Sequence, residues 1–260
     1  SAKVFYDGII MGECSINNCR QSVNFSIQLN EKHLWELGCG RLYDVELQFG
    51  GEDTVNTYFG LRDIALDEKG LMLNGKHIFQ RLVLDQGFYP DGIYTAPEDA
   101  SFAKDIELSL AAGFNGARLH QKAFEPRFLY HCDKIGYMVW GEYGNWGMDY
   151  SDMRALPNML MEWLEILNRD YNHPSIVCWC PFNETWDYAG RRQDDDMIKT
   201  VYRATKQLDS MRPCIDTSGN FHVQTDIFDV HDYEQNVEVF KERYDPVSYT
   251  HLTLPTICSV

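Results

Sequence analysis

The feature that most constrains this chain is a regular alternation, from about residue 70 onward, between short apolar runs and amphipathic helical segments. The apolar runs predict strands at residues 81–86, 116–120, 137–142, 176–180, 213–217 and 227–233. The segments between them predict helices at 95–113, 125–136 and 157–171, and a further helix that starts at 194. Apolar strands separated by amphipathic helices are typical of a parallel sheet covered by helices. The sequence therefore predicts a parallel sheet covered by helices, an arrangement that a (β/α) barrel also has.

Residues at the ends of the helical segments support this assignment. Thr95 and Glu98 have the spacing of a capping box, and the helix that follows them stops at Gly113. Pro126 suits the first turn of the second helix. The acidic run 194–196 predicts a helix start, because negative charge stabilises a helix N-terminus.

Residues 1–64 have a different texture, because apolar and polar side chains alternate there with a period of two. The stretches 23–29 and 43–49 both show this pattern, which is typical of half-buried antiparallel strands. An immunoglobulin-like sandwich takes about 100 residues. We therefore expect an N-terminally truncated immunoglobulin-like β-sandwich at 1–64, a TIM-barrel domain at 65–246, and a separate tail at 247–260.

Polar residues follow the predicted strands at or just beyond their carboxyl ends. They are Arg118, His120, Glu142, Asn183, Glu184, Asp216, His231, Asp232 and Tyr233. In a (β/α) barrel these strand ends form the active site. Glu184 is the most conspicuous, because only Asn183 separates it from the apolar run "SIVCWCPF".

A carboxyl group in this position suggests glycoside chemistry. Two carboxyl groups that flank a sugar can break a glycosidic bond, one as proton donor and the other as nucleophile or base. The donor must hold a proton near neutral pH, and burial raises a carboxyl pKa. We therefore expect apolar neighbours to raise the pKa of Glu184. Aromatic residues that could stack on a sugar are Trp140, Tyr143, Trp146 and Trp186.

Each of these residues also has a structural interpretation. A single Glu after a strand more often caps a helix or lies on the surface, and Trp residues more often belong to the core. Arg118 could pair with a buried carboxylate, and Glu142 could cap a loop. His120 and His231 could be structural histidines with satisfied hydrogen bonds. The functional interpretation rests on the coincidence of polar residues at successive strand ends.

The charge and the cysteine content indicate which binding partners and which cellular compartment the protein is expected to have. With 23 Lys and Arg against 39 Asp and Glu, the net charge is −16, which disfavours nucleic acid as a partner. No apolar run reaches the length needed to span a membrane. The eight cysteines form no CxxC pair and no zinc-type spacing, which favours free thiols and a cytoplasmic location. Because the first residue is Ser1 and not Met, export stays open, as does the oligomeric state.

Several stretches resemble glycoside hydrolase family 2, the β-galactosidase, β-glucuronidase and β-mannosidase group. They are "YFGLRDI" (58–64), "LNGKHIF" (73–79), "AGFNGARLH" (112–120), "FLYHCDKIGYMVWGE" (128–142) and "RDYNHPSIVCWCPFNETW" (169–186). The resemblance covers most of residues 40–235. It implies a sandwich domain before a catalytic (β/α)8 TIM barrel and a retaining mechanism on a glycoside substrate. Because only six barrel strands are predicted here, we expect a TIM barrel truncated at its C-terminal end. We expect no cofactor and no metal.

The resemblance also implies roles for the site residues. Glu184 would be the general acid/base, and Asn183 would contact the sugar 2-hydroxyl. Arg118 would lie beside the nucleophile, and Tyr233 would hydrogen-bond that nucleophile. Substrate-subsite roles are implied for His120, Glu142, Trp186, His231 and Asp232. The chain departs from the family where many members read "SHYP" and it reads "LHQKAFEP", which disfavours a galactosidase-like pocket.

The nucleophile that the family places at the end of the seventh strand has no counterpart here. Glu234 and Glu238 lie on or after the sixth predicted strand. Residues 247–260, "VSYTHLTLPTICSV", have no helical period and resemble a translated sequencing adapter. We therefore expect a non-native tail and an inactive fragment of a retaining β-glycosidase.

Two other function classes stay open at this point. The first is a non-catalytic carbohydrate-binding barrel that keeps the sugar contacts without the nucleophile. The second is a metal-dependent barrel hydrolase that uses His120, Glu142 and His231. The absence of an HxH pair after the first strand argues against the second.

Overall fold

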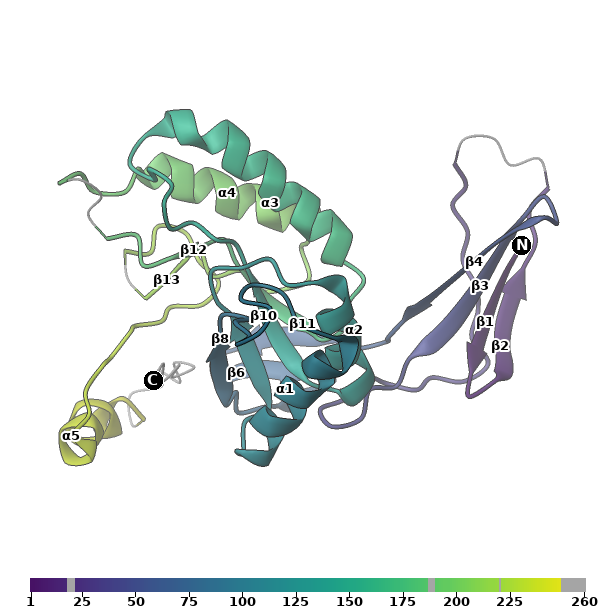
Figure 1. The fold of residues 1–260 in the computed structure, drawn as a ribbon, viewed down its shortest axis with the longest axis horizontal. Helices are drawn as coiled ribbons and strands as arrows, with labels where there is room; N and C mark the ends of the chain where they lie inside the picture. The colour runs from purple at the N-terminus through teal and green to yellow at the C-terminus, as the bar shows by residue number, and fades with distance from the viewer. Residues whose placement is uncertain (18–21, 187–189, 220, 249–260) are drawn as a thin grey trace.

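The computed structural model describes residues 1–17, 22–186, 190–219 and 221–248. Figure 1 shows an antiparallel sheet at one end of the molecule, set apart from a larger α/β part. This N-terminal sheet has the strand order β2-β1-β3-β4. Its strands are β1 (Ala2–Tyr6), β2 (Ile9–Cys14), β3 (Tyr43–Phe49) and β4 (Asp53–Phe59). The predicted strand at 43–49 is confirmed as β3.

The predicted strand at 23–29 is wrong. The segment runs beside β2, since a Cβ on Gly12 would lie 2.5 Å from Ile27 Cγ2. However, the backbone from 22 to 29 belongs to no strand, and Asn30 N donates to Met11 O (2.8 Å) only beyond its end. The alternation of side chains is present, but a strand also requires a hydrogen-bonded neighbour along its length.

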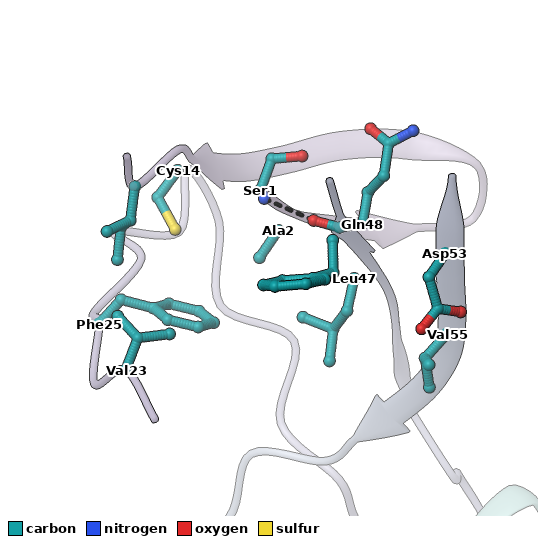
Figure 2. Close-up of a pocket in the computed structure, with 11 residues that line it drawn as sticks. Ser1, Ala2, Cys14, Val23, Phe25, Leu47, Gln48, Asp53 and Val55 are labelled. Atoms are coloured by element: carbon teal, nitrogen blue, oxygen red, sulfur yellow. Dashed lines mark hydrogen bonds between the residues drawn. The ribbon is translucent and has the colours of Figure 1, made fainter. Parts of the chain in front are cut away.

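An apolar hollow lies between this segment and the N-terminal sheet. Figure 2 shows Val23 and Phe25 on one side of it and Leu47 and Val55 on the other. Phe25 is 44% exposed and Val55 is 53% exposed. The apolar face of this sheet is therefore only partly covered by the described residues.

A small antiparallel sheet connects the two parts of the molecule. It consists of β5 (Ile64–Asp67), β6 (Gly70–Leu73) and β7 (Lys76–His77). The junction is held at Asp133, a fully buried residue of helix α2 (Pro126–Ile135). Tyr58 Oη of β4 donates to Asp133 Oδ2 (2.8 Å), and Trp35 Nε1 donates to the Asp133 carbonyl (2.7 Å).

The larger part contains the predicted parallel sheet, in the order β11-β10-β9-β8. Its strands are β8 (Leu82–Asp85), β9 (Gly116–Leu119), β10 (Met138–Glu142) and β11 (Ile176–Cys180). The helices are α1 (Asp99–Ala111), α2 (Pro126–Ile135), α3 (Leu156–Asp170, after a 3-10 turn at Met153–Ala155), α4 (Asp195–Leu208) and α5 (Val237–Ser248). In this larger part, the predicted strands and helices between residues 81 and 208 are confirmed, apart from small differences at their ends.

The fifth and sixth predicted strands are not formed as expected. Residues 213–217 contribute one parallel bridge, Trp179 with Cys214, and a short pair of β12 (Phe182–Asn183) with β13 (Thr217–Ser218). The prediction for 227–233 is wrong, because this segment makes side-chain contacts and no backbone ladder. Over the described residues the sheet is open, with β8 as one edge.

The ends of the helices show which local sequence signals predicted a helix end correctly. The predicted capping box is wrong: α1 begins at Asp99, and Thr95 Oγ1 donates instead to the Gly92 carbonyl (3.2 Å). The acidic start of α4 is confirmed, because the Asp194 side chain accepts from Asp196 N and Met197 N. Gly136 ends α2 at φ +82°, a conformation that favours glycine.

The strands of the parallel sheet are buried on both faces. Val139 and Trp179 pack against the helices. The rings of Trp179 and of Trp163 in α3 meet edge-on, with their centroids 5.8 Å apart. Met138 and Trp140 pack on the opposite face, against Trp35. Trp140 is fully buried and donates from Nε1 to Gln80 Oε1 (2.7 Å), so it is a core residue and not an exposed platform for sugar.

Candidate active site

Glu184 follows β12, one residue beyond the short pairing with β13. Its backbone has φ +47°, in the left-handed region that non-glycine residues seldom adopt. The turn is held because Glu184 N donates to the Ser218 carbonyl (2.9 Å) and Trp186 N donates to the Glu184 carbonyl (2.8 Å). The side chain is 15% exposed, so the carboxyl group is half-buried at the carboxyl end of the sheet, as the sequence predicts.

Two side chains from the segment that follows β13 contact the same oxygen of this carboxylate. His231 Nδ1 lies 2.5 Å from Glu184 Oε1, and Tyr233 Oη donates to the same oxygen (2.7 Å). The structure therefore places Tyr233 on Glu184. Oε2 has no hydrogen bond to the described residues and stays available to a ligand.

The prediction that apolar neighbours raise the pKa of Glu184 is wrong for this arrangement. Burial is the largest single influence and acts to raise the pKa. The hydrogen bonds from Tyr233 and His231, together with the charge of Arg118, act in the opposite direction and outweigh it. The pKa of the carboxyl group therefore lies below its ordinary value.

Arg118 of β9 is fully buried beneath Glu184 and connects several strand ends. Its Nε donates to Glu142 Oε2 of β10 (2.7 Å), and its Nη2 donates to Asn183 Oδ1. Its Nη1 lies 3.3 Å from His231 Nε2. Burial acts to lower the pKa of Arg118, but the Glu142 carboxylate more than compensates and raises it, so the guanidinium is charged.

Glu142 is the second carboxylate of the site, and both of its oxygens are engaged. Oε2 accepts from Arg118, and Oε1 accepts from Gln121 N (3.0 Å). The expectation that Arg118 pairs with a buried carboxylate is thus met by Glu142.

Asn183 presents an unpaired donor to the site. Its backbone N donates to Asn145 Oδ1 (2.9 Å), and Asn145 Nδ2 donates back to its carbonyl (3.2 Å). Its side-chain Nδ2 is buried and has no hydrogen-bond partner among the described residues. A buried orphan donor is costly unless a ligand satisfies it.

His120 and Trp146 form another wall of the site. The two rings meet edge-on with their centroids 5.1 Å apart, and His120 Nδ1 lies 2.8 Å from Gln86 Nε2. Burial lowers the pKa of His120, so the imidazole is neutral near pH 7. Trp146 is 54% exposed and Trp186 is 43% exposed, and both offer ring surface to solvent.

Two of the predicted residues are engaged elsewhere. The Asp232 carboxylate accepts from Arg243 and Tyr244 of α5, and those hydrogen bonds lower its pKa to about 2. Its side chain therefore holds α5 in place and does not join Glu184. Tyr143 is also engaged, since its hydroxyl donates to Glu162 (2.6 Å).

Sequence reasoning missed four residues that support the site. Asn145 and Gln121 hold the Asn183 loop, with Gln121 Nε2 donating to Asn145 Oδ1 (2.6 Å). Ser218 and Asp229 lie behind His231. Ser218 directly follows the predicted strand at 213–217, and this position at a strand end is the sequence signal that could have identified it.

The metal-dependent interpretation finds no support in the described residues, where no group of three His, Cys, Asp or Glu side chains could hold an ion. His120, Glu142 and His231 instead make the separate contacts given above. The six cysteines within the described residues are free thiols, and Cys19 and Cys258 lie outside those residues. Within the same residues, no helix is both long and apolar enough to cross a bilayer.

Comparison with known proteins identifies a family and several relatives. The family model described as "Glycosyl hydrolases family 2, TIM barrel domain" matches residues 64–253. A β-galactosidase of Lactococcus lactis is 29% identical over 225 residues, which is 81% of this chain and 21% of that enzyme. A putative β-glucuronidase of Formosa agariphila is 28% identical over 74% of this chain and 24% of its own length.

Solved structures agree in fold. The β-glucuronidase of Parabacteroides merdae has a TM-score of 0.81 at 17% identity, over 98% of this chain and 34% of that chain. The β-glucuronidase of Ruminococcus gnavus has a TM-score of 0.80 at 18% identity, over 99% of this chain and 47% of that chain. The chain spans roughly a fifth of the length of the L. lactis relative. With the family model matched over most of its length, the chain belongs to glycoside hydrolase family 2 and carries the TIM-barrel domain of that family.

Proposed function

We propose that the protein to which this chain belongs is a retaining β-glycoside hydrolase with Glu184 as its general acid/base. The observation that carries the proposal is the half-buried Glu184 carboxylate. Its Oε1 is held by His231 and Tyr233, and its Oε2 remains available to a leaving group. The relatives are named β-galactosidases and β-glucuronidases, so a terminal β-galactoside or β-glucuronide is the proposed substrate class.

The surrounding residues take defined parts in this proposal. The unpaired Asn183 Nδ2 donates to a sugar hydroxyl, and Arg118 fixes Asn183 from below. Trp146 and Trp186 offer ring faces to the sugar, beside His120. Glu142 supports Arg118, and Asp232 supports α5, so neither of these carboxylates is proposed to touch substrate.

The domain organisation is proposed in the same terms. Residues 1–64 belong to an immunoglobulin-like sandwich, residues 65–246 to a TIM barrel, and residues 247–260 are a non-native tail. Each curated relative is several times longer than the matched region, which supports a complete enzyme that extends beyond this region. The nucleophile is proposed to lie outside residues 1–246, so this chain alone is expected to be inactive.

Replacement of Glu184 tests the proposal in the complete enzyme. Loss of a general acid typically costs about 10²–10⁴-fold in rate, so Glu184→Gln should lower kcat/KM on a phenyl β-glycoside by at least about 100-fold. A 2,4-dinitrophenyl glycoside, whose leaving group needs no proton, should lose much less in the glycosylation step. The matched control is Glu107→Gln on the exposed face of α1, which should leave the rate unchanged. Equal rates for Glu184→Gln and wild type would refute the assignment.

The alternative is a non-catalytic carbohydrate-binding barrel that keeps the sugar contacts without the nucleophile, and the unpaired donor of Asn183 suits sugar binding as well as it suits catalysis. A mechanism-based 2-deoxy-2-fluoro glycoside separates the two. Covalent labelling of a Glu outside residues 1–246 would support the retaining enzyme. Saturable sugar binding without labelling or turnover would support the binding protein.

A further inference from the structure

We propose that Gln121 is a positioning residue that couples two contacts assigned above to the sugar, the indole ring of Trp146 and the side-chain amide of Asn183. The inference deepens the proposed function and rests on it. Gln121 lies in the stretch "LHQKAFEP", where the chain departs from the pattern of its family. The observation that carries the inference is a chain of hydrogen bonds with fixed donor and acceptor roles, which runs from Trp146 through Gln121 to Asn183.

The first arm of this chain holds Trp146. Its backbone N donates to Gln121 Oε1 (2.9 Å). A backbone N–H can only donate, so the amide oxygen of Gln121 faces Trp146 and the amide nitrogen takes the other position. The indole ring of Trp146 is 54% exposed and meets His120 edge-on, with the ring centroids 5.1 Å apart. Gln121 therefore fixes the backbone that carries this exposed ring.

The second arm reaches Asn183 through Asn145. Gln121 Nε2 donates to Asn145 Oδ1 (2.6 Å), and the same oxygen accepts from Asn183 N (2.9 Å). Asn145 Nδ2 donates to the Asn183 carbonyl (3.2 Å), so the backbone of Asn183 determines the orientation of the Asn145 amide. Asn145 is fully buried, and losing one of these contacts leaves a polar atom without solvent to satisfy it.

The side chain of Asn183 is held from the other side by Arg118. Arg118 Nη2 can only donate, so it binds Asn183 Oδ1. The remaining amide nitrogen, Nδ2, is buried and has no hydrogen-bond partner among the described residues. Displacement of the Asn183 backbone therefore displaces the donor that the proposed function assigns to a sugar hydroxyl.

The backbone of Gln121 is itself held in an unusual conformation. It has φ +55°, in the left-handed region that non-glycine residues seldom adopt. Gln121 N donates to Glu142 Oε1 (3.0 Å), and a Cβ on Gly144 would lie 2.8 Å from the Gln121 carbonyl oxygen. The loop that carries Asn145 and Trp146 therefore packs closely on Gln121. Such a conformation persists only where the surrounding contacts hold it.

Glutamine supplies both groups that this position needs, an oxygen that accepts and a nitrogen that donates. Glutamate has the same shape but, when ionised, can only accept. It would keep the contact to Trp146 N and place a carboxylate oxygen against Asn145 Oδ1. Asn145 cannot turn its amide toward that carboxylate without losing both contacts to the Asn183 backbone. Gln121→Glu therefore breaks one arm of the chain and keeps the other.

The test is a set of double-mutant cycles in the complete enzyme, with the Kd of a sulfur-linked glycoside measured by calorimetry. The probes are phenyl 1-thio-β-galactoside and phenyl 1-thio-β-glucuronide. Gln121→Glu should raise the Kd about tenfold, which corresponds to the loss of one hydrogen bond. In an Asn183→Ala background the same change should raise the Kd less than about twofold, because the displaced donor is absent. In a Trp146→Ala background it should still raise the Kd about tenfold.

Two further variants separate positioning from general damage. Gln121→Ala removes both arms, so its loss of affinity should shrink in the Asn183→Ala background and also in the Trp146→Ala background. Gln207→Glu adds the same charge at an exposed position of α4, and it should leave the Kd within about twofold of wild type. A general distortion of the site by Gln121→Glu would instead couple equally to Trp146 and to Asn183.

Asn145→Asp replaces Gln121→Glu if that variant does not fold. It keeps Oδ1 for Gln121 and for Asn183 N, and it places a carboxylate oxygen against the Asn183 carbonyl. The same pattern of couplings is expected. A Kd within about twofold of wild type in the folded variant, or a loss that persists in full in the Asn183→Ala background, would overturn the proposal.

Turnover distinguishes this inference from the proposed function. If the complete enzyme hydrolyses no glycoside but binds a thioglycoside with these couplings, the proposed enzyme fails and the role of Gln121 stands. If it hydrolyses a phenyl β-glycoside but the effects of the Gln121 and Asn183 changes are additive, the proposed function stands and the role of Gln121 fails.

Discussion

The two sheets of this molecule differ in how completely they are covered. Every residue of β10 and β11 is buried, with helices against one face and Trp35 with β6 against the other. In the N-terminal sheet, Phe49 is 64% exposed and Val55 is 53% exposed, and the described residues leave an apolar hollow on its face (Figure 2). A strand can thus be correctly specified by its own sequence while its tertiary partners decide how much that strand contributes to stability.

The largest effect expected from this difference comes from removing Trp179. It is fully buried, meets Trp163 edge-on, and donates from Nε1 to Asp209 Oδ2 (2.8 Å). Trp179→Ala should lower the free energy of unfolding by about 3–5 kcal/mol. The matched change in the N-terminal sheet, Phe49→Ala, should cost less than about 0.5 kcal/mol. Urea unfolding followed by circular dichroism measures both, and equal losses would erase the contrast between the sheets.

A smaller effect should appear in the pH dependence of stability. Burial acts to lower the pKa of His222, but hydrogen bonds to Asp216 and Asp229 raise it to about 10. A histidine with a raised pKa stabilises the fold below its unfolded pKa of about 6.5 and loses that contribution as pH rises through the folded value. Between pH 7 and 10 the loss should be on the order of 3 kcal/mol.

The His222→Gln variant isolates this contribution. It should be less stable than wild type at pH 7, and the difference should shrink as pH approaches 10. The control His77→Gln removes an exposed pair with Asp67 and should change stability by less than about 1 kcal/mol across the range. A constant difference between His222→Gln and wild type at every pH would contradict the assignment of a charged His222.

The smallest effect concerns the junction between the two parts. Tyr58→Phe removes the hydrogen bond to the buried Asp133 carboxylate, which keeps His173 Nδ1 (2.5 Å) and Ser175 N (2.9 Å) as partners. We expect a loss of about 1 kcal/mol, measured by urea unfolding. Tyr130→Phe is the matched control, because its hydroxyl has no hydrogen bond among the described residues. A loss above about 3 kcal/mol would mean that the junction stabilises the whole chain.

Much of the fold could be predicted because its signals are local. The apolar runs of β8 to β11 and the amphipathic helices α1 to α4 are visible in any window of the sequence. Predictions failed where formation depends on a distant partner. The 23–29 segment has the alternation of a strand but no ladder, and Thr95 has the spacing of a cap but binds Gly92.

The site was predicted in part for the same reason. Residues at strand ends could be identified, since the carboxyl ends of parallel strands converge. Arg118, Glu142 and Asn183 do meet beneath Glu184. The sequence could not show that the Asp232 side chain lies outside the site, because its partners are the α5 residues Arg243 and Tyr244.

The sequence by itself determined the order of strands and helices and the delivery of Glu184 at the end of a buried run, because burial periodicity is a local property. Only the tertiary structure decided the surroundings that lower the pKa of Glu184. His231 and Tyr233 reach it across 47 and 49 residues of chain. Ser218 lies 3.2 Å from His231 Nε2 and donates to Asp229. A carboxyl pKa depends on the charges and donors within a few ångströms, and packing alone brings those groups together.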